Sequence, residues 1–317
     1  AAFRVRRAVA VVAGVLSVGA GASDAGAQDP MSWGEFRTID RAEPDARVAW
    51  GATAEAFGEW YLPAGSGPHP VVVLVHGGCW QAIADLGYVG HLGRRLADWG
   101  WAVWTPEFRR VDQEGGDWPA ILEDVGAATD HLRTSALELR LDLSTVAVVG
   151  HSSGGHLALW LAGRHRLPLD PPGGPRLRGA DPLPIHGVVG LAAITDLEDY
   201  ERRGGGGCGP ESVARLLGEP VELREERLDL ASPVGRLPLG VPQLLVTGAL
   251  DETVPAAHGR VWVDAAEAAG DPVRLLIPAG AGHFEVVAPW TDPFGVVAPE
   301  LRAFLDSLKV PPDAPSP

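Results

Sequence analysis

The stretch VAVVGHSSGG, residues 146–155, decides how this chain folds. Its four apolar residues predict a buried strand, and the Gly-x-Ser-x-Gly pattern predicts a sharp turn into an apolar helix over 156–162. Glycines flank the turn because a side chain at either position would collide with neighbouring backbone. The turn places the hydroxyl of Ser152 at its apex, as in a nucleophile elbow. An ordinary glycine- and serine-rich turn between a strand and a helix is the alternative interpretation.

Short apolar runs alternate with helical stretches along the rest of the chain. Several of these runs are continuously apolar, which is typical of parallel strands buried on both faces. The alternation predicts an α/β fold, in which a mostly parallel twisted sheet is flanked by helices and joined by crossover connections. The expected strands are 59–62, 71–75, 102–106, 146–149, 187–192, 243–247 and 273–277, and the expected helices are 88–99, 118–134, 153–164, 256–269 and 296–308.

The composition indicates one large domain or two small ones with an ample core. The 317 residues are 46% hydrophobic, and the formal net charge is −15. An excess of acidic groups repels phosphate backbones and anionic lipids, so we expect no nucleic-acid partner. Since no internal repeat divides the chain, we expect a single domain over 28–310 and a disordered tail over 311–317.

The N-terminal residues have the pattern of an export signal. Three arginines within 4–7 give a positive start, and the apolar stretch 8–20 is too short to span a bilayer, so we expect no stable membrane insertion. The small residues 25–27 form a cleavage pattern, which predicts removal of 1–27 and a periplasmic or secreted protein. The alternative is translation from Met31, the only methionine, which would leave the protein in the cytoplasm.

Two segments interrupt the alternation of strands and helices. Residues 167–183 are rich in proline and glycine and predict a surface loop. Residues 200–236 contain four consecutive glycines and scattered charges, and they lie between two expected core strands. We interpret this second segment as a small cap that covers the cleft as a partly mobile lid, with a plain surface excursion as the alternative.

A serine nucleophile requires a base to accept its proton and an acid to hold that base. Asp251 follows the expected strand 243–247, at the end of the sheet where functional residues collect. Capping the next helix is the alternative role for this carboxylate, and Asp196 is the reserve acid. His283 lies on the glycine-rich loop 280–284 after the last expected strand, so we assign it as the base.

The other histidines lack this context after a strand. His151 and His156 flank Ser152, but we expect the geometry of the turn to direct their rings elsewhere. Surface or packing roles are expected for His91, His131, His165, His186 and His258.

The segment HGGCW, residues 76–80, follows the expected strand 71–75. Glycines leave their amide N–H groups free to point at a developing oxyanion, so we expect an oxyanion hole that includes Gly77 and Gly78. The amide of Ser153 would be a further donor at the start of a helix, where the helix dipole adds positive potential. A glycine-rich turn without a catalytic role is the alternative.

These motifs resemble those of the α/β-hydrolase superfamily, and within it the esterases and arylformamidases that carry a His-Gly-Gly-x-Trp motif. The elbow 150–156 matches that group. The segment PEFRR, residues 106–110, also matches, although Phe108 stands where the group more often has tyrosine. Asp124 fits the pattern as well, and the resemblance covers about residues 55–308.

The resemblance implies acyl transfer to water through an acyl-enzyme, with no metal and no organic cofactor. It implies Ser152 as the nucleophile, Asp251 as the acid and His283 as the base. It also implies structural roles for Arg109 and Asp124 in the loops that hold the site.

The resemblance further places Trp80, and with it Cys79, beside the acyl pocket. The chain has two cysteines, Cys79 and Cys208, which either pair or both stay free. In an oxidising compartment, a disulfide between them would tie the oxyanion loop to the expected cap.

We expect a carboxylesterase-like serine hydrolase that acts on small-molecule ester or amide substrates. N-formylkynurenine formamidase has the same triad and is the first alternative, but its role in intracellular tryptophan catabolism conflicts with export. A prolyl-oligopeptidase-like peptidase is disfavoured because the chain has no room for a large N-terminal propeller. A hydrolase-fold binding protein without turnover is disfavoured because the acid, base and nucleophile are all present.

Overall fold

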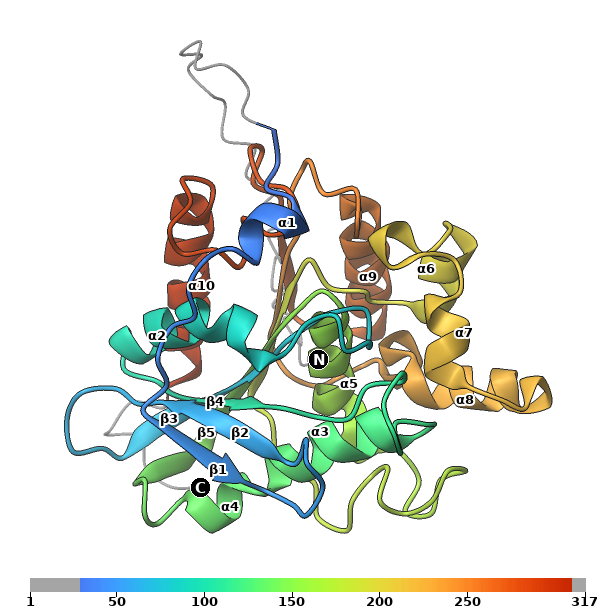
Figure 1. Cartoon of the computed structure of the whole chain (residues 1–317), viewed down its shortest axis with the longest axis horizontal. Coiled ribbons are helices and arrows are strands. Elements are labelled where there is room, and N and C mark those ends of the chain that lie inside the picture. The colour runs from blue at the N-terminus through green and yellow to red at the C-terminus, as the bar shows by residue number, and fades with distance from the viewer. Residues whose placement is uncertain (1–28, 310–317) are drawn as a thin grey trace, which may run out of the picture.

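A computed structural model describes residues 29–309. These residues form one eight-stranded sheet that is flanked by helices (Figure 1). The strands are β1 (Ala46–Ala49), β2 (Phe57–Tyr61), β3 (His69–Val75), β4 (Ala102–Pro106), β5 (Leu141–His151), β6 (Gly187–Leu191), β7 (Gln243–Val246) and β8 (Val273–Leu276). Their order is β1-β2-β4-β3-β5-β6-β7-β8. Strands β3 to β8 run parallel to one another, whereas β2 pairs antiparallel with both β4 and the edge strand β1. The predicted α/β class with a mostly parallel sheet is therefore confirmed.

The sheet separates two hydrophobic cores. Successive side chains of a strand point to opposite faces, so the odd-numbered residues of 71–75 pack in one core and the even-numbered ones in the other. All five of these β3 residues are fully buried. Helices α3 (Ala120–Asp130), α5 (Ser153–Gly163) and α9 (Ala256–Ala269) cover the first face, and α2 (Gly90–Asp98) and α10 (Phe294–Leu308) cover the second.

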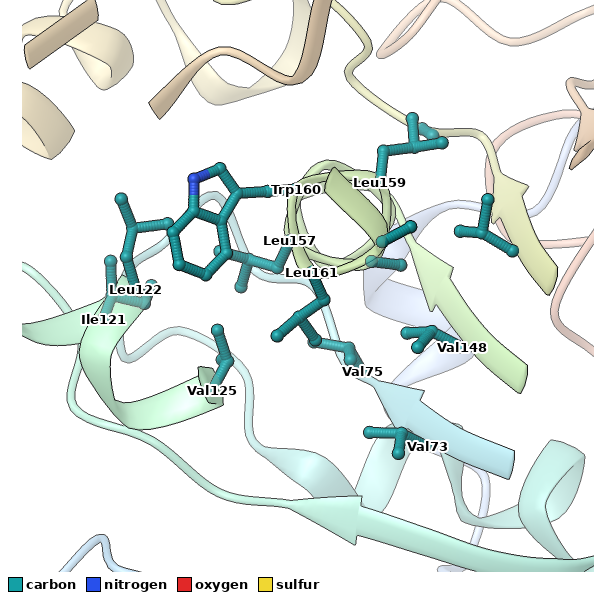
Figure 2. Packing of buried hydrophobic residues seen from close by; sticks show 14 of the residues in the cluster. Val73, Val75, Ile121, Leu122, Val125, Val148, Leu157, Leu159, Trp160 and Leu161 are labelled. Carbon is teal, nitrogen blue, oxygen red and sulfur yellow. The ribbon is translucent and has the colours of Figure 1, made fainter. Parts of the chain in front are cut away.

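Helix α5 is buried along its whole length, as its apolar sequence predicts. Figure 2 shows the helix end-on, with Leu161 directed at Val75 of the sheet and Trp160 directed at Leu122 of α3. The indole Nε1 of Trp160 also donates to the carbonyl oxygen of Leu230 at 2.8 Å. The helix that begins at the expected nucleophile is therefore fixed by the sheet, by α3 and by the segment expected to form a cap.

The sequence predicted the longer helices but not all of their ends. The expected helix 118–134 is divided into α3 and the short α4 (Leu132–Ser135). The 3-10 helix η1 (Leu86–Val89) precedes α2, which begins at Gly90. Sequence periodicity did not indicate β1, whose residues are half-buried or exposed at the sheet edge, or α1 (Trp33–Phe36), a single turn closed by a Ser32–Glu35 capping box.

The expected cap contains short helices rather than an extended loop. They are α6 (Leu197–Arg202), η3 (Gly206–Cys208), α7 (Ser212–Leu217), η4 (Val221–Leu223), α8 (Arg224–Ala231) and η5 (Pro233–Arg236). Figure 1 places α6, α7 and α8 together on the side of the molecule near α5 and α9. Motion of this segment as a lid stays a prediction.

Two expected features, the export signal over 1–27 and the disordered tail over 311–317, lie outside the described residues. No helix within 29–309 combines the length and the apolar character needed to cross a membrane.

The carboxyl ends of the parallel strands meet at one edge of the sheet, where open α/β sheets bind ligands. Val75 of β3 pairs with Gly150 of β5, so the loop after β3 lies beside the turn after β5. The expected base and acid follow β8 and β7 at the same edge. The topology therefore brings together segments from the first quarter, the middle and the end of the chain.

Candidate active site

Ser152, His283 and Asp251 form a chain of hydrogen bonds at this edge of the sheet. His283 Nε2 lies 3.0 Å from Ser152 Oγ, and His283 Nδ1 lies 2.8 Å from Asp251 Oδ2. A carboxylate only accepts hydrogen bonds, so Nδ1 carries the proton and Nε2 accepts from the serine hydroxyl. The structure thus brings together the three residues that the sequence assigned as nucleophile, base and acid, and all three are buried.

The turn that carries Ser152 depends on close backbone packing. Ser152 has φ 58° and ψ −124°, a conformation that is strained for a residue with a side chain. A Cβ on Gly154 would lie 2.3 Å from the carbonyl oxygens of Val75 and His76, and a Cβ on Gly150 would lie 2.1 Å from the carbonyl oxygen of Gly154. These contacts are the collisions expected from the sequence, and they explain why only glycine fits at both positions.

Asp251 both holds the base and accepts hydrogen bonds from the turn that follows it, which are the two roles expected from the sequence. Its Oδ2 holds His283, while its Oδ1 accepts from two backbone amides of the following turn, each at 2.8 Å. The reserve acid, Asp196, instead caps α6 by accepting from two amides of the first helical turn. Asp251 is therefore the carboxylate that the structure brings to the histidine.

The oxyanion loop, residues 76–80, departs from the expectation at one glycine. Gly77 donates its amide N–H to the hydroxyl of Tyr88, so this amide is not available to a substrate. The contact is enforced by close packing, because a Cβ on Gly77 would lie 2.6 Å from both Tyr88 Oη and the carbonyl oxygen of His151. The expectation that Gly77 donates to an oxyanion is therefore wrong for this geometry.

The next three residues of the loop have positive φ. The angles are 113° at Gly78, 56° at Cys79 and 61° at Trp80, a run that turns successive amides toward one side. In the part of the chain that the structure describes, the amides of Gly78 and Cys79 have no hydrogen-bond acceptor. Ser153 is the first residue of α5, where amides lack a partner within the helix. These three amides are available beside the nucleophile.

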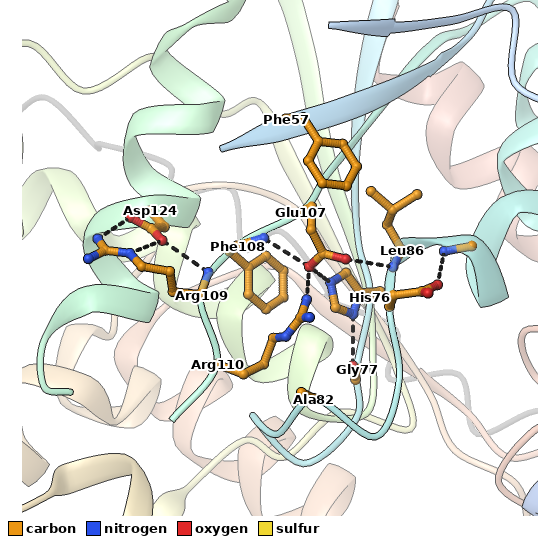
Figure 3. A network of polar contacts seen from close by, with 12 residues as sticks. Phe57, His76, Gly77, Ala82, Leu86, Glu107, Phe108, Arg109, Arg110 and Asp124 are labelled. Carbon is orange, nitrogen blue, oxygen red and sulfur yellow. Dashed lines mark hydrogen bonds and ion pairs between the residues drawn. The ribbon is translucent and has the colours of Figure 1, made fainter. Parts of the chain in front are cut away.

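Glu107 anchors the oxyanion loop through His76, and it was not among the residues expected to act (Figure 3). Its carboxylate lies 2.9 Å from His76 Nε2 and pairs with the guanidinium of Arg110. It also accepts from the amides of Phe108, at 2.9 Å, and Leu86, at 3.3 Å. One buried carboxylate therefore connects the loops that follow β3 and β4 with the start of η1.

The carboxylate charge of Glu107 is stabilised by His76, by Arg110 and by a backbone amide. Burial alone would raise the pKa of Glu107, but His76, Arg110 and the Phe108 amide outweigh it and lower the pKa to about 2. The other ring nitrogen of His76, Nδ1, lies 2.8 Å from the carbonyl oxygen of Gly77. The loop thus begins on a histidine whose two ring nitrogens both contact acceptor oxygens.

A second ion pair lies on the opposite side of the same segment (Figure 3). Arg109 donates from Nε, at 2.8 Å, and from Nη2, at 2.6 Å, to the two carboxylate oxygens of Asp124. Arg109 Nη1 also donates to the carbonyl oxygen of Gly115. As expected, this pair holds a loop and does not line the cavity that contains the nucleophile.

Cys79 and Cys208 form a disulfide, with their Cα atoms 5.4 Å apart. The bond joins the oxyanion loop to η3 in the expected cap, which are separated by 129 residues. The adjacent Gly207 lines the cavity beside Ser152. The alternative in which both cysteines stay free is therefore wrong, and part of the expected cap lies next to the nucleophile.

Ser152 opens into a cavity of about 930 Å³. The walls include Trp33, Ile83, Leu250 and Phe284, so much of the lining is apolar. The N-terminal residues 29–33 form one side, a contribution that the sequence did not indicate. The size is within the range of sites that bind small molecules.

Trp80 does not line this cavity, in contrast to the expectation. Its side chain is 1% exposed, and Nε1 donates to His156 Nδ1 at 3.2 Å. His156 Nε2 in turn lies 3.0 Å from the carbonyl oxygen of Ala231. Burial lowers the pKa of His156 to about 4, although its bond to Ala231 acts in the opposite direction. Trp80 therefore supports the loop from behind through a neutral histidine.

His151 lines the cavity instead of pointing elsewhere, so the expectation for this residue is wrong. Its ring lies 4.8 Å from that of His283, measured between centroids, and contacts Tyr88 through Nδ1. The position of His151, directly before the nucleophile at the carboxyl end of a strand, is the signal that could have identified it. Tyr88 has no comparable signal, because it reaches the site from a separate helical segment.

The fold is that of the α/β-hydrolases, a superfamily in which a serine follows a strand and an acid and a histidine come later in the chain. A family model named BD-FAE matches residues 59–265, and the chain belongs to this α/β-hydrolase esterase family. The resemblance inferred from the motifs is confirmed.

Curated relatives and solved structures agree with this assignment. The chain is 29% identical to Esterase LipC of Mycobacterium tuberculosis over 227 residues, which cover 68% of this chain and 53% of the relative. It is 26% identical to the probable carboxylic ester hydrolase LipM of the same organism, with coverages of 63% and 45%. The chain thus spans about half the length of the curated relatives it matches.

The similar structures establish the fold. A truncated carbohydrate esterase from gut microbiota has a TM-score of 0.69 and 20% identity, with 84% of this chain and 96% of that chain covered. Esterase B from Lactobacillus rhamnosis has a TM-score of 0.68 and 20% identity, with coverages of 86% and 89%.

Proposed function

We propose that this protein is a serine hydrolase that cleaves carboxylic esters of small molecules through an acyl-enzyme. The observation that carries the proposal is the hydrogen-bonded chain from Asp251 through His283 to Ser152, which opens into a cavity of about 930 Å³. Membership of an esterase family and the names of the curated relatives support ester bonds as the target.

The proposed reaction begins when Ser152 Oγ attacks the ester carbonyl and its proton passes to His283 Nε2. Asp251 stabilises the imidazolium that forms. The carbonyl electrons move to the oxygen, which accepts hydrogen bonds from the amides of Gly78, Cys79 and Ser153. His283 then protonates the departing alcohol, and the acyl group remains on Ser152. A water molecule then gives a proton to His283 and attacks the acyl carbonyl. The proton returns to Ser152 Oγ as the carboxylic acid leaves.

The walls of the cavity favour uncharged substrates with an apolar portion. Trp33, Ile83, Leu250 and Phe284 offer apolar surface, whereas Asp29 and Glu252 place carboxylates at its border. The formal net charge of −15 also opposes the approach of polyanions. We therefore expect neutral esters to be hydrolysed faster than anionic ones.

The test compares p-nitrophenyl acetate, p-nitrophenyl octanoate and N-formylkynurenine as substrates of the purified protein. We expect ester turnover to dominate and Ser152→Ala to fold normally but lose several orders of magnitude in kcat. Ser144→Ala is the control, because it removes an exposed serine hydroxyl on β5 that contacts only Asp142. Full ester hydrolysis by Ser152→Ala would refute the assignment of the nucleophile, and dominant formamide cleavage would refute the assignment of the substrate.

We also propose export, with cleavage after Ala27. The disulfide between Cys79 and Cys208 supports an oxidising compartment, where such bonds persist. The test is expression with the native N-terminus, followed by fractionation and mass spectrometry of the mature chain. A chain that begins at Gln28 outside the cytoplasm is expected, and an unprocessed cytoplasmic chain would contradict export.

A further inference from the structure

A second chain of hydrogen bonds runs along the cavity side of the elbow and shares no side chain with the first. It begins at the amide of Gly77, which donates to Tyr88 Oη. Tyr88 Oη lies 3.0 Å from His151 Nδ1, and His151 Nε2 lies 2.9 Å from the backbone carbonyl oxygen of His283. The chain thus contacts the oxyanion loop, the elbow and the loop of the base.

The direction of each hydrogen bond in this chain follows from its two ends and from the protonation of His151. The Gly77 amide can only donate, and the His283 carbonyl can only accept. His151 therefore donates from Nε2 to that carbonyl. When the ring is neutral, its Nδ1 accepts from the Tyr88 hydroxyl, and the hydroxyl oxygen accepts from Gly77. Burial and the nearby His283 favour the neutral ring, because they lower the pKa of His151 well below its usual range.

We propose that Tyr88 and His151 are positioning residues for the reaction at Ser152, an inference that rests on the proposed ester hydrolysis. Neither side chain is required to exchange a proton with substrate. Their hydrogen bonds fix the relative positions of three loops that come from distant parts of the chain.

The Tyr88 hydroxyl acts on the oxyanion loop. By accepting from Gly77, it turns that amide away from the substrate, and the following amides of Gly78 and Cys79 remain without an acceptor among residues 29–309. Gly77 is packed so tightly that an added Cβ would lie 2.6 Å from Tyr88 Oη, so the hydroxyl and the loop are in close contact. The hydroxyl therefore determines which amides face the developing oxyanion.

His151 acts on the base. Its backbone leads directly into Ser152, and its ring holds the main chain of His283 at 2.9 Å. The 3.0 Å contact between His283 Nε2 and Ser152 Oγ is thus supported by a hydrogen bond to the main chain of His283 as well as by Asp251. Small displacements of such groups are costly, since about 1 Å of misplacement can lower a rate by about 100-fold.

The test measures kcat and KM for p-nitrophenyl butyrate with Tyr88→Phe. This change removes the hydroxyl but keeps the ring, which packs against Trp33 and Phe36. We expect kcat to fall by about 10- to 100-fold with KM within about twofold of wild type. Tyr61→Phe is the matched control, because it removes a buried hydroxyl on β2 that forms only 3.4 Å contacts.

Two further variants separate the two hydrogen bonds of His151, one to the Tyr88 hydroxyl and one to the His283 carbonyl. His151→Asn keeps an acceptor near the Tyr88 hydroxyl, whereas His151→Gln keeps a donor for the His283 carbonyl. Both are expected to lower kcat, and Tyr88→Phe should lower kcat by a smaller factor in His151→Gln than in the wild type, because the Tyr88–His151 hydrogen bond is already absent there. The midpoint of the acid limb of the pH profile should stay at its wild-type value in Tyr88→Phe, because the hydroxyl positions the loop and does not contact the base.

Wild-type kcat in a folded Tyr88→Phe protein would overturn the inference, as would an equal loss in Tyr61→Phe. A raised KM with unchanged kcat would also overturn it, since that result assigns Tyr88 to substrate binding. If Tyr88→Phe is unfolded at the assay temperature by circular dichroism, the His151→Gln result decides by the same criteria. These outcomes are distinct from failure of the proposed function, which is detected by turnover in Ser152→Ala.

Discussion

The nucleophile elbow, residues 150–155, and the oxyanion loop, residues 76–80, lie side by side but are stabilised in different ways. Each follows the carboxyl end of a parallel strand, and Val75 pairs with Gly150 where the two strands end. The elbow is held by backbone packing against its glycines. The oxyanion loop is held by side chains from other segments, namely Tyr88, Glu107 and, through a disulfide, Cys208.

This difference shows which parts of a site a local sequence can specify. The elbow needs small residues at fixed spacing, so six consecutive positions contain its determinants. The loop needs partners from three other segments, and its disulfide partner lies 129 residues away along the chain. Variants of the elbow glycines should therefore affect folding first, and variants of the loop anchors should affect catalysis together with stability.

The largest effect is expected for Gly154→Ala in the elbow. The new Cβ would lie 2.3 Å from two backbone carbonyl oxygens, which cannot move without displacing β3. We expect a loss of more than about 4 kcal/mol in the free energy of unfolding, measured by urea denaturation, or no soluble protein at all. In the loop, Gly78→Ala should be milder, because its closest new contact is the Ala84 side chain at 2.9 Å and its remaining cost is the strain of alanine at a φ of 113°.

Gly295→Ala in α10 is the control for these glycine variants. A Cβ there has open space around it, and helix propensity favours alanine by about 0.5–1 kcal/mol. The proposed difference between the elbow and the oxyanion loop would be refuted if Gly154→Ala were as stable as wild type. It would also be refuted if Gly78→Ala lowered the free energy of unfolding as much as Gly154→Ala.

The sequence predicted the elbow and its order of partners because these depend on local patterns. Ser152 and His283 each have a glycine-rich context directly after an apolar run, and Asp251 follows another run. The fate of the Gly77 amide depends instead on the position of Tyr88, which no local pattern reports. Trp80 was misplaced for a similar reason, since a motif does not reveal which side of a loop its side chain occupies.

The same reasoning applies to the fold. Central strands such as β4 and β6 were predicted nearly to the residue because burial on both faces leaves a continuous apolar run. The edge strand β1 has no such run, and α1 is too short for a helical period. The helices of the expected cap were missed because short polar helices are stabilised by packing more than by their own pattern.

A smaller effect than that of Gly154→Ala is expected for Cys208→Ser, which detaches the oxyanion loop from η3. Breaking a link across 129 residues should lower the free energy of unfolding by about 2–4 kcal/mol. Cys79 and Trp80 have positive φ, so the released loop can relax and kcat should fall by about 10-fold. Thermal unfolding and p-nitrophenyl butyrate kinetics, each with and without reductant, measure the two effects.

Cys79→Ser provides the control, because it breaks the same bond from the other side. The double variant should lose no more stability than either single variant, since one bond is removed in all three. Unchanged kcat in Cys208→Ser would contradict a role for the disulfide in holding the loop, even if the stability fell as expected.

The smallest of the three effects on stability is expected for Glu107→Gln, which removes the charge that anchors the oxyanion loop. Arg110 then loses its buried counter-ion, and such a loss is destabilising because the remaining charge stays desolvated. The lowering of the Glu107 pKa from 4.5 to about 2 corresponds to at most about 3 kcal/mol near pH 7. Because the amide oxygen of glutamine still accepts hydrogen bonds, we expect a loss of about 1–2 kcal/mol in urea denaturation at pH 7, together with a fall in kcat.

The effect of Glu107→Gln on stability should depend on pH. A carboxylate whose pKa is lowered by folding contributes its full stability above pH 4.5, and this contribution disappears as the pH falls toward about 2. The stability difference between wild type and Glu107→Gln should therefore be constant above about pH 5 and shrink below about pH 4.

Asp124→Asn is the matched control for Glu107→Gln, since it converts the carboxylate of the neighbouring Arg109 pair to an amide. It should destabilise the protein but leave kcat close to that of wild type, because that pair does not contact the oxyanion loop. Equal losses of kcat in the two variants would mean that the loop responds to general destabilisation rather than to its anchor.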